Sequence, residues 1–444
     1  PAPPRAPAAI QPIEFAGETA EAKRARLAAE LAGAGQAAAV LTLPDSLSWL
    51  LNIRGADIPR NPVVQCLGIL HADATLDLFI DTAKLSPALR GHLGPEVRLH
   101  PPEAFGEALT RLPGVVRVDR ATAPLAVSQI LGASGVALAW GADPCLLPKA
   151  RKNPAEIAGM EAAHLRDGAA MVEFLAWLAA ELPKGEMTEI RAVTALEGFR
   201  RATNALKDIS FETICGAGPN GAIIHYRVSR ATDRAFRDGE MVVIDSGGQY
   251  VDGTTDVTRT IAIGAAGEDE CTAFTRVLQG MIAVSRLRWP KGLAGSHLDA
   301  IARYPLWLAH QDYNHGTGHG VGAYLSVHEG PAGLSRRYDQ PLEPGMILSN
   351  EPGYYREGAF GIRIENLILV EEAAPLPGGD AEREMLAFRT LTFVPIDRGL
   401  IDRQMLTRAE VDWIDRYHAE VLRRIGPRLS DGARVWLESA CAPL

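Results

Sequence analysis

The sequence predicts an α/β (α+β) protein of two domains, and three observations lead to this prediction. The chain has 444 residues, which is enough for two or three domains at the usual ~100–200 residues each. Up to about residue 146, short apolar runs alternate with helical patterns, as in a small α/β domain. From there to about residue 395, strand patterns alternate with Gly-rich turns and a few helices.

The expected first domain covers residues 1–146. Residues 1–17 are rich in proline and alanine, which favours a linker. A helix is expected from Thr19, a plausible N-cap, to about Ala32, with Gly33 just beyond it. Apolar runs predict strands at residues 37–42, 63–70, 76–80, 115–118 and 135–140.

The expected second domain covers residues 147–444. Its first helix should begin at Asn153-Pro154, an N-cap followed by proline at the first helical position, and run to about Leu182. Thr188 should begin another helix. Residues 406–425 have the pattern of a terminal amphipathic helix.

The composition excludes several classes of protein. Acidic residues outnumber basic ones, 54 to 45, and the net charge of −9 argues against nucleic acid or an anionic membrane as the main partner. No apolar run reaches the ~18 residues of a membrane-spanning helix. The five cysteines are scattered and contain no CxxC pair, so a reducing, cytoplasmic compartment is expected.

Two acidic residues lie at the ends of apolar strands, which suggests a metal site. Asp245 follows four apolar residues, and Asp256 opens the next apolar stretch eleven residues later. A carboxylate at the end of a buried strand is costly unless it is paired or binds a metal. For either aspartate alone, the simpler interpretation is a turn cap, which Asp-Ser-Gly segments commonly provide.

The same arrangement occurs a second time near residue 350. The stretch that opens at Gly239 carries Asp245 and Asp256, and the stretch that opens at Gly345 carries Glu351 and Glu365. In both, an apolar strand ends in an acid, glycines follow, and a second strand carries another acid. Two such hairpins could form a pseudo-symmetric site, although a repeat this short can also arise by chance.

Four histidines lie beside glycines or at the ends of apolar runs. His315 and His319 are four residues apart, but the glycines between and around them disfavour a helix and favour an extended or looping chain. His225 and His328 complete the set. The alternatives are a flexible Gly-rich loop with incidental histidines and ordinary hydrogen-bonded core histidines. With four carboxylates nearby, the set suits Mn²⁺, Co²⁺ or Zn²⁺ and a two-metal centre.

At these residues the sequence resembles the pita-bread metallopeptidases, and among them the Xaa-Pro aminopeptidases of the aminopeptidase P type. Their metal ligands occur in the order Asp, Asp, His, Glu, Glu, within segments like His315–Gly320, Asn350–Tyr355 and Arg363–Asn366. The resemblance implies two divalent ions, most simply Mn²⁺, with Co²⁺ or Zn²⁺ as alternatives. It implies five ligands, which are Asp245, Asp256, His319, Glu351 and Glu365, with Asp256 and Glu365 bridging the ions.

The resemblance also implies a reaction and roles for further residues. The reaction is release of the first residue from a peptide with proline in second position, by attack of a bridging hydroxide. Glu351 would be the catalytic base. His328 would contact the scissile carbonyl and His225 the scissile nitrogen, and both count as catalytic residues. Side chains implied in substrate handling are His225, His315, His328, Arg363 and Tyr355.

The resemblance extends to the first domain and implies a creatinase-like α/β fold there. The segment Leu43–Gly55 carries this likeness, although a helix rich in Trp and Leu is usually core. Long, cytosolic members have two N-terminal domains, whereas this chain shows one, so it is expected to lack the first. A homodimer is expected from the family.

Four alternatives share parts of this pattern. Prolidase, which cleaves Xaa-Pro dipeptides, has the same ligands and is the nearest. Methionine aminopeptidase also shares them, but the N-terminal domain argues against it. Creatinase has the two-domain layout without a metal, and non-catalytic pita-bread peptide-binding modules typically lose ligands, whereas all five are present here.

Overall fold

The computed structural model of the chain describes residues 3–380 and 382–444, which form two compact units. One unit comprises Pro1–Glu156 together with Tyr324–Ser326, and the other comprises Ile157–Ala323 and Val327–Leu444. We call them the N-terminal unit and the catalytic unit. The division predicted at residues 146/147 falls at the start of α7 (Leu146–Ala150) and stays a prediction.

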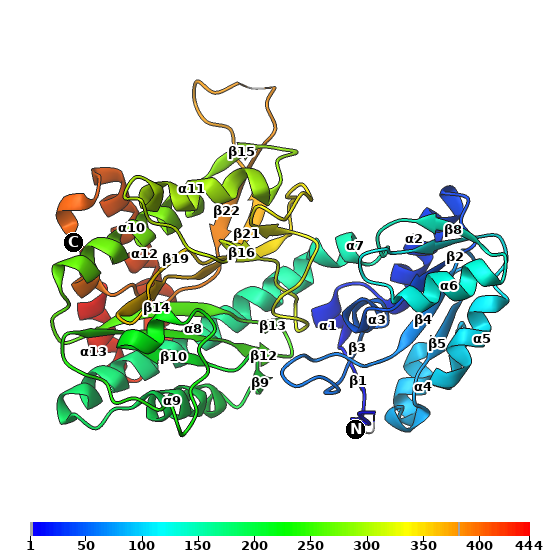
Figure 1. Cartoon of the computed structure of the whole chain (residues 1–444), viewed down its shortest axis with the longest axis horizontal. Helices are drawn as coiled ribbons and strands as arrows, with labels where there is room; N and C mark the ends of the chain where they lie inside the picture. The colour runs from blue at the N-terminus through cyan, green and yellow to red at the C-terminus, as the bar shows by residue number, and fades with distance from the viewer. Residues whose placement is uncertain (1–2, 381) are drawn as a thin grey trace. The chain divides into compact units, whose positions relative to one another are not determined.

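The N-terminal unit is built on one mixed sheet with helices on both faces (Figure 1). The strand order is β6-β5-β4-β2-β7-β8; β4 is antiparallel to β2 and β5, and the other neighbours are parallel. The strands span Ala38–Leu41 (β2), Leu67–His71 (β4), Leu76–Phe79 (β5), Val97–His100 (β6), Val115–Val118 (β7) and Ala137–Trp140 (β8).

Alternation along β2 supplies both cores of this unit. Ala38 and Val40 pack with residues of α5 (Phe105–Thr110) and α6 (Leu125–Ala133). Ala39 and Leu41 pack on the other face, where helices α2 (Ala20–Gly33), α3 (Pro44–Leu50) and α4 (Pro87–Leu93) bury their leucines. Successive strand residues point to opposite faces, so one short strand serves two layers.

The predicted elements of this unit are confirmed, with three corrections, of which the smallest is that α2 includes Gly33 and ends one residue later than predicted. Thr19 caps α2 by accepting a hydrogen bond from the Ala22 backbone nitrogen. The strand predicted at 63–70 begins only at Leu67. The described part of the predicted linker contains β1 (Ala9–Ile10) and α1 (Ile13–Ala16), and β1 pairs with β3 (Ile53–Arg54). The proline content of this segment does not indicate β1, because a strand distant in the sequence satisfies its backbone hydrogen-bonding groups.

Helix α8 (Pro154–Glu181), which begins in the last residues of the N-terminal unit, and helix α9 (Glu189–Ala202) of the catalytic unit begin where the sequence predicts. In α8, Asn153 Oδ1 accepts from the Ala155 and Glu156 nitrogens, and the Asn153 nitrogen donates back to Glu156. In α9, the Thr188 side chain accepts from the Arg191 nitrogen. Both caps satisfy some of the first N–H groups, which have no partner within a helix, and the cap at Asn153 is reciprocal.

Two antiparallel strand pairs correspond to the predicted repeat. Strand β11 (Glu240–Ser246) pairs with β14 (Val257–Ile263), and β18 (Ile347–Asn350) pairs with β21 (Asn366–Glu372). A small inner hairpin lies within each, β12 (Gly248–Tyr250) with β13 (Gly253–Thr254) and β19 (Gly353–Arg356) with β20 (Phe360–Arg363). Each outer pair therefore brings the end of one strand beside the start of the next, which is where the four acids lie.

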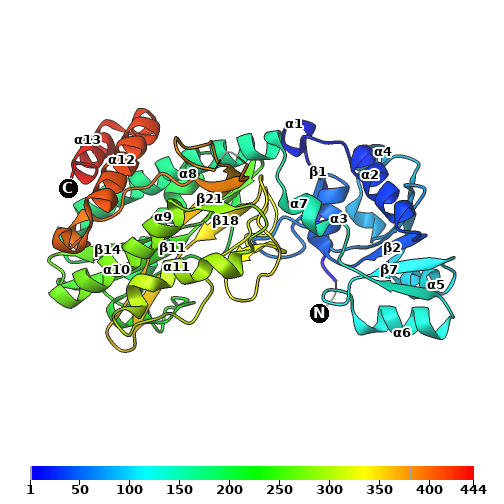
Figure 2. The same cartoon turned by 90° about the horizontal axis from the view of Figure 1, so that it is seen from above.

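Helices enclose these strands and complete the main core of the unit. Aliphatic residues of α10 (Glu268–Ser285), α11 (Gly295–Trp307), α12 (Arg408–Ile425) and α13 (Asp431–Ala440) meet in one cluster. The terminal helix predicted at 406–425 is α12, with Thr407 and Glu410 forming its capping box. Helix α13 follows it at the C-terminal end (Figure 2) and was not predicted.

Among residues 3–380 and 382–444, no helix combines the length and the apolar character that crossing a bilayer requires.

Candidate active site

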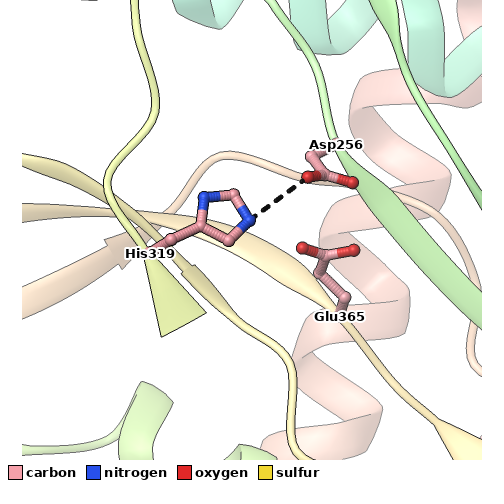
Figure 3. Close-up of side chains that lie close together, drawn as sticks. All are labelled: Asp256, His319 and Glu365. Carbon is pink, nitrogen blue, oxygen red and sulfur yellow. Dashed lines mark ion pairs between the residues drawn. The ribbon is translucent and has the colours of Figure 1, made fainter. Parts of the chain in front are cut away.

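The structure gathers the five predicted metal ligands in one cavity of about 850 Å³ in the catalytic unit. Asp256, His319 and Glu365 offer ligand atoms that all lie within 4.8 Å of one another. Figure 3 shows the two carboxylates facing each other and the imidazole directed at Asp256. The His319 Nε2 atom is 3.6 Å from Asp256 Oδ2 and 3.4 Å from Glu351 Oε1.

Each acid is placed by the end of a strand. Asp245 is the penultimate residue of β11, and Asp256 directly precedes β14. Glu351 directly follows β18, and Glu365 directly precedes β21. The strand pairing sets Asp245 opposite Thr258, so the acids of one hairpin lie at the same end of it. Both predicted hairpins thus contribute their acids to one site.

Glycines bring the histidine strand close to its neighbours, as predicted for this segment. Gly318 and His319 form the short strand β16 (Gly318–His319). A Cβ atom at Gly318 would lie 1.8 Å from the Ser349 carbonyl oxygen, which no side chain can accommodate. The His319 nitrogen donates to Ser349 Oγ at 2.9 Å. Only glycine therefore permits the approach that places His319 among the acids.

The acids are buried at a cost that a cation would relieve. Burial, followed by the neighbouring Asp245 and Glu351 carboxylates, raises the pKa of Asp256 well above its usual value. Burial and the charges of Asp256 and Glu351 likewise raise the pKa of Glu365. One oxygen each of Asp245, Asp256 and Glu365 is buried and accepts no hydrogen bond from any described residue. Such oxygens are costly to bury unless a cation binds them.

The His319 imidazole is oriented as a metal ligand. Its Nδ1 lies 2.9 Å from the Gly320 carbonyl oxygen, to which only an N–H can donate. This assigns the lone pair to Nε2, the atom that faces Asp256 and Glu351. A ligating histidine usually donates its other nitrogen in this way. The donor set, oxygen-rich with one imidazole, therefore fits divalent ions such as Mn²⁺, Co²⁺ or Zn²⁺.

A chain of hydrogen bonds leads from Asp245 to His315. Arg363 Nη2 donates to Asp245 Oδ2 at 2.6 Å, and Arg363 Nη1 donates to the Tyr355 hydroxyl at 2.6 Å. That hydroxyl lies 2.9 Å from His315 Nε2, while His315 Nδ1 lies 2.8 Å from the Gly316 carbonyl oxygen. Tyr355 therefore donates to a neutral imidazole. Burial and the positive charge of Arg363 lower the pKa of His315 to about 3.

The predicted substrate-handling residues lie in this cavity, with one exception. His225, His315, His328 and Arg363 line it, whereas Tyr355 acts behind them through its hydroxyl. The rings of His319 and His328 meet edge to face with centroids 4.1 Å apart. Burial and the adjacent His319 lower the pKa of His328 to about 4.

Sequence reasoning missed several residues that serve this site. Ser349 Oγ donates to Glu351 Oε1 at 2.9 Å, and Thr258 Oγ1 donates to Glu365 Oε2 at 2.8 Å. Each lies two residues from a predicted acid, so the two-residue period of a strand could have indicated them. No local pattern marks the aromatic and aliphatic walls of the cavity, which include Phe211, Ile214, Ile224, Tyr313 and Tyr338.

Comparisons with known proteins match nearly the whole chain. Residues 1–156 match the creatinase/prolidase N-terminal domain, 158–372 match metallopeptidase family M24, and 384–444 match the C-terminal region of peptidase M24. A probable Xaa-Pro aminopeptidase P of Laccaria bicolor is 40% identical over 97% of this chain and 68% of its own length. A protein of the same name from Neosartorya fischeri is 40% identical over 100% of this chain and 70% of its own.

Solved structures give the same result. An X-prolyl aminopeptidase of Caenorhabditis elegans, described as a cytosolic enzyme with a di-nuclear active site, has a TM-score of 0.94 and 35% identity, covering 100% of this chain and 74% of its own. An Xaa-Pro dipeptidase of Bacillus anthracis has a TM-score of 0.66 and 23% identity over 85% of this chain and 99% of its own, a likeness of fold. The predicted creatinase-like and pita-bread folds are confirmed.

Proposed function

This chain belongs to metallopeptidase family M24, and from that premise we propose that it is a metal-dependent Xaa-Pro aminopeptidase. It removes the N-terminal residue from peptides that have proline in second position. The observation that carries the proposal is the cluster of five ligand-type side chains with buried, unpaired carboxylate oxygens, in a chain similar throughout to Xaa-Pro aminopeptidases. Proline lacks a backbone N–H and has a fixed ring, so its tertiary amide requires a dedicated pocket.

Two divalent ions would be held by Asp245, Asp256, His319, Glu351 and Glu365. When bound, a pair of such ions activates a water at neutral pH and polarises the substrate carbonyl. We propose Mn²⁺ as the ion, because the site is rich in hard oxygen donors and contains no thiolate. Arg363 fixes the Asp245 carboxylate through two hydrogen bonds, at 2.6 and 3.2 Å, and so orients one ligand before any ion binds.

Glu351 is the proposed proton carrier. Its Oε1 accepts from Ser349 and faces His319 Nε2, so we assign the proton transfer to the other oxygen, Oε2. Burial raises the pKa of Glu351 in the metal-free chain. A carboxylate within reach of the attacking water can act as a general base. Glu351 would take a proton from the attacking water and deliver it to the leaving proline nitrogen.

The three cavity histidines bind and orient the peptide. We assign to His328, whose ring packs against that of His319, the donation of a hydrogen bond to the oxygen of the scissile carbonyl. His225 is assigned to the scissile nitrogen. His315, whose ring lies tilted against that of Tyr313 with centroids 4.8 Å apart, is held by Tyr355 and offers an uncharged aromatic wall for the proline ring.

The test is hydrolysis of Arg-Pro-Pro and of the dipeptide Arg-Pro by Mn²⁺-loaded protein. We expect release of arginine from the tripeptide and little from the dipeptide. Cleavage of the dipeptide alone would instead identify a prolidase. If neither peptide were cleaved, with bound metal confirmed by elemental analysis, the protein would be a non-catalytic module. The matched control is Asp256→Asn, which keeps the shape of the side chain and removes one ligand charge.

Oligomeric state and cellular location complete the proposal. A homodimer is supported by the family and by the exposed apolar side chains of Tyr304, Trp307 and Leu308 in and just after α11. Light scattering on the purified chain would test it, and a mass of one chain would refute it. A cytosolic location is supported by the scattered cysteines and by the description of the Caenorhabditis elegans enzyme.

A further inference from the structure

The loop that carries His225 has almost no core of its own. It follows β10 (Ile214–Ala217) and the short 3₁₀ turn Gly218–Ala222, and it contains no strand or helix before β11. Between residues 222 and 235, Tyr226 is the one buried side chain, with 6% of its surface exposed. His225 directly precedes this tyrosine, so whatever fixes Tyr226 also fixes His225.

The Tyr226 hydroxyl reaches a buried carboxylate on another element. It donates to Glu189 Oε2 at 2.9 Å. Glu189 is the first residue of α9 and is fully buried, with 0% of its surface exposed. No predicted role in metal or substrate binding falls on Glu189, and it does not line the cavity of the active site. Its burial therefore requires another explanation.

The same carboxylate also holds both ends of the loop. At the start, Oε1 accepts from the Ala217 nitrogen at 2.8 Å and from Asn220 Nδ2 at 2.9 Å. At the end, Oε2 accepts from the Arg234 nitrogen at 3.2 Å. Burial raises the pKa of Glu189, and these donors oppose that rise. Four donors from separate parts of the chain converge on this one carboxylate, which makes it a rigid junction.

We propose that Glu189 is a positioning residue for the peptidase reaction, acting through His225. Its carboxylate ties the start, the buried tyrosine and the end of the loop to helix α9, and thereby fixes the imidazole of His225 in the cavity. This inference rests on the proposed function, because it assigns His225 to the scissile nitrogen. Glu189 touches neither substrate nor metal, so its effect must pass through the loop.

The first experiment is a double-mutant cycle with Glu189→Gln and His225→Ala on Mn²⁺-loaded protein. Glutamine keeps the size of the side chain but can accept through only one oxygen. We expect kcat on Arg-Pro-Pro to fall roughly 10–100-fold in Glu189→Gln, as for outer-shell partners generally, with KM changed less than about twofold. The double variant should be no slower than His225→Ala alone. Losses that multiply would overturn the inference.

Asp397→Asn is the matched control. Asp397 is half-buried and also accepts from backbone nitrogens, those of Ala262 and Gly399, but it holds no loop with a cavity histidine. Its kcat should stay within about twofold of wild type, and its small effect should multiply with that of His225→Ala. If Asp397→Asn lowered kcat in the wild-type background but not in the His225→Ala background, the cycle would not be specific for residues that hold the His225 loop. That result would overturn the inference.

The second experiment needs no substrate. The loop contains the exposed residues Arg227 and Arg230, which are trypsin sites. Glu189→Gln should be cut after these residues at least tenfold faster than wild type or Asp397→Asn, because loosened loops are cut through local opening. Equal cutting rates would overturn the inference. If the wild type cleaved no peptide but Glu189→Gln still made the loop more sensitive to trypsin, the proposed function would be refuted. Glu189 would then remain the residue that anchors this loop.

Discussion

Two regions of the molecule, the core of the N-terminal unit and the active-site cavity, bury charged side chains in different ways. In the N-terminal unit, Lys84 Nζ lies 2.6 Å from Asp57 Oδ2, with 4% and 1% of the two side chains exposed. Lys149 similarly lies 2.9 Å from Asp45 Oδ2. In the active-site cavity, four carboxylates lie together, Asp245 pairs with the guanidinium of Arg363, and three of the four keep an oxygen without a hydrogen-bond donor among the described residues.

The difference separates a structural from a functional use of buried charge. A paired ion in a core satisfies its own charge and needs nothing further, whereas like charges brought together without partners destabilise the fold that carries them. A cluster of the second kind persists when binding compensates for it. The contrast therefore indicates that the acid cluster of the active site is incomplete without cations, whereas a buried ion pair such as Lys84–Asp57 needs none.

The largest expected effect is on turnover. Glu351→Gln should lower kcat on Arg-Pro-Pro at least about 1,000-fold, because it removes the base and a ligand charge. Asp57→Asn, at a more deeply buried carboxylate of the N-terminal unit, should keep kcat within about twofold. Far-ultraviolet circular dichroism should be unchanged in both. Comparable losses in the two variants would remove the distinction between the units.

The next effect is on stability and belongs to the N-terminal unit. Lys84→Met leaves Asp57 buried without its cation and should lower the free energy of unfolding by about 3–5 kcal/mol. The matched control is Lys291→Met, which breaks an exposed pair with Glu384 and should cost about 0–1 kcal/mol. Urea unfolding measures both. A Lys84→Met variant as stable as the control would contradict the structural role of the buried pair.

A third way to bury a titratable group is to keep it neutral. Burial, with the charges of Arg259 and Arg398 beside it, lowers the pKa of His418 to about 4, from 6.5 in the unfolded chain. Its Nε2 accepts from the Ile396 nitrogen at 3.1 Å. The unfolded chain therefore binds more protons at pH 5, and the contribution of His418, present above pH 6.5, is lost on acidification. The loss between pH 7.5 and 5 is about 2 kcal/mol.

Comparing wild type with His418→Gln isolates this contribution from those of other groups. Glutamine can accept the Ile396 hydrogen bond but does not titrate. Its free energy of unfolding should fall less than that of wild type between pH 7.5 and 5, by about the same 2 kcal/mol. Identical pH profiles would show that His418 is not held neutral in the fold.

The smallest expected effect is the most specific to the carboxylate cluster. In metal-free protein, Asp256→Asn should raise the free energy of unfolding by about 1–2 kcal/mol, since it removes one of several like charges. Added Mn²⁺ should then stabilise wild type more than the variant. Thermal unfolding with and without Mn²⁺ measures both. If the variant were less stable than metal-free wild type, the carboxylates of the cluster would not repel one another as we propose.

Much of this could be predicted because the signals are local. Thr19, Asn153 and Thr188 mark helix starts through side chains that cap their own chain. The acids and His319 lie at strand ends in short segments whose spacing indicates a metal site. Close approach at Gly318 was likewise expected from its sequence context.

Contacts between distant parts of the chain left no such signal. Residues 9–10 pair with a strand more than forty positions away. Arg54 Nε donates to the carbonyl oxygen of Tyr324, and Glu189 gathers donors from positions 217–234. These contacts depend on the tertiary fold rather than on neighbouring residues, so neither composition nor periodicity could indicate them.

The central claim is that the buried, unpaired carboxylate oxygens are held apart for two cations. A crystal structure of the Mn²⁺-loaded chain, with anomalous data collected at the manganese edge, tests it most directly. The account predicts two anomalous peaks within the cluster of Asp245, Asp256, His319, Glu351 and Glu365, in protein that cleaves Arg-Pro-Pro. A cluster without peaks, in protein that still cleaves the peptide, would contradict it.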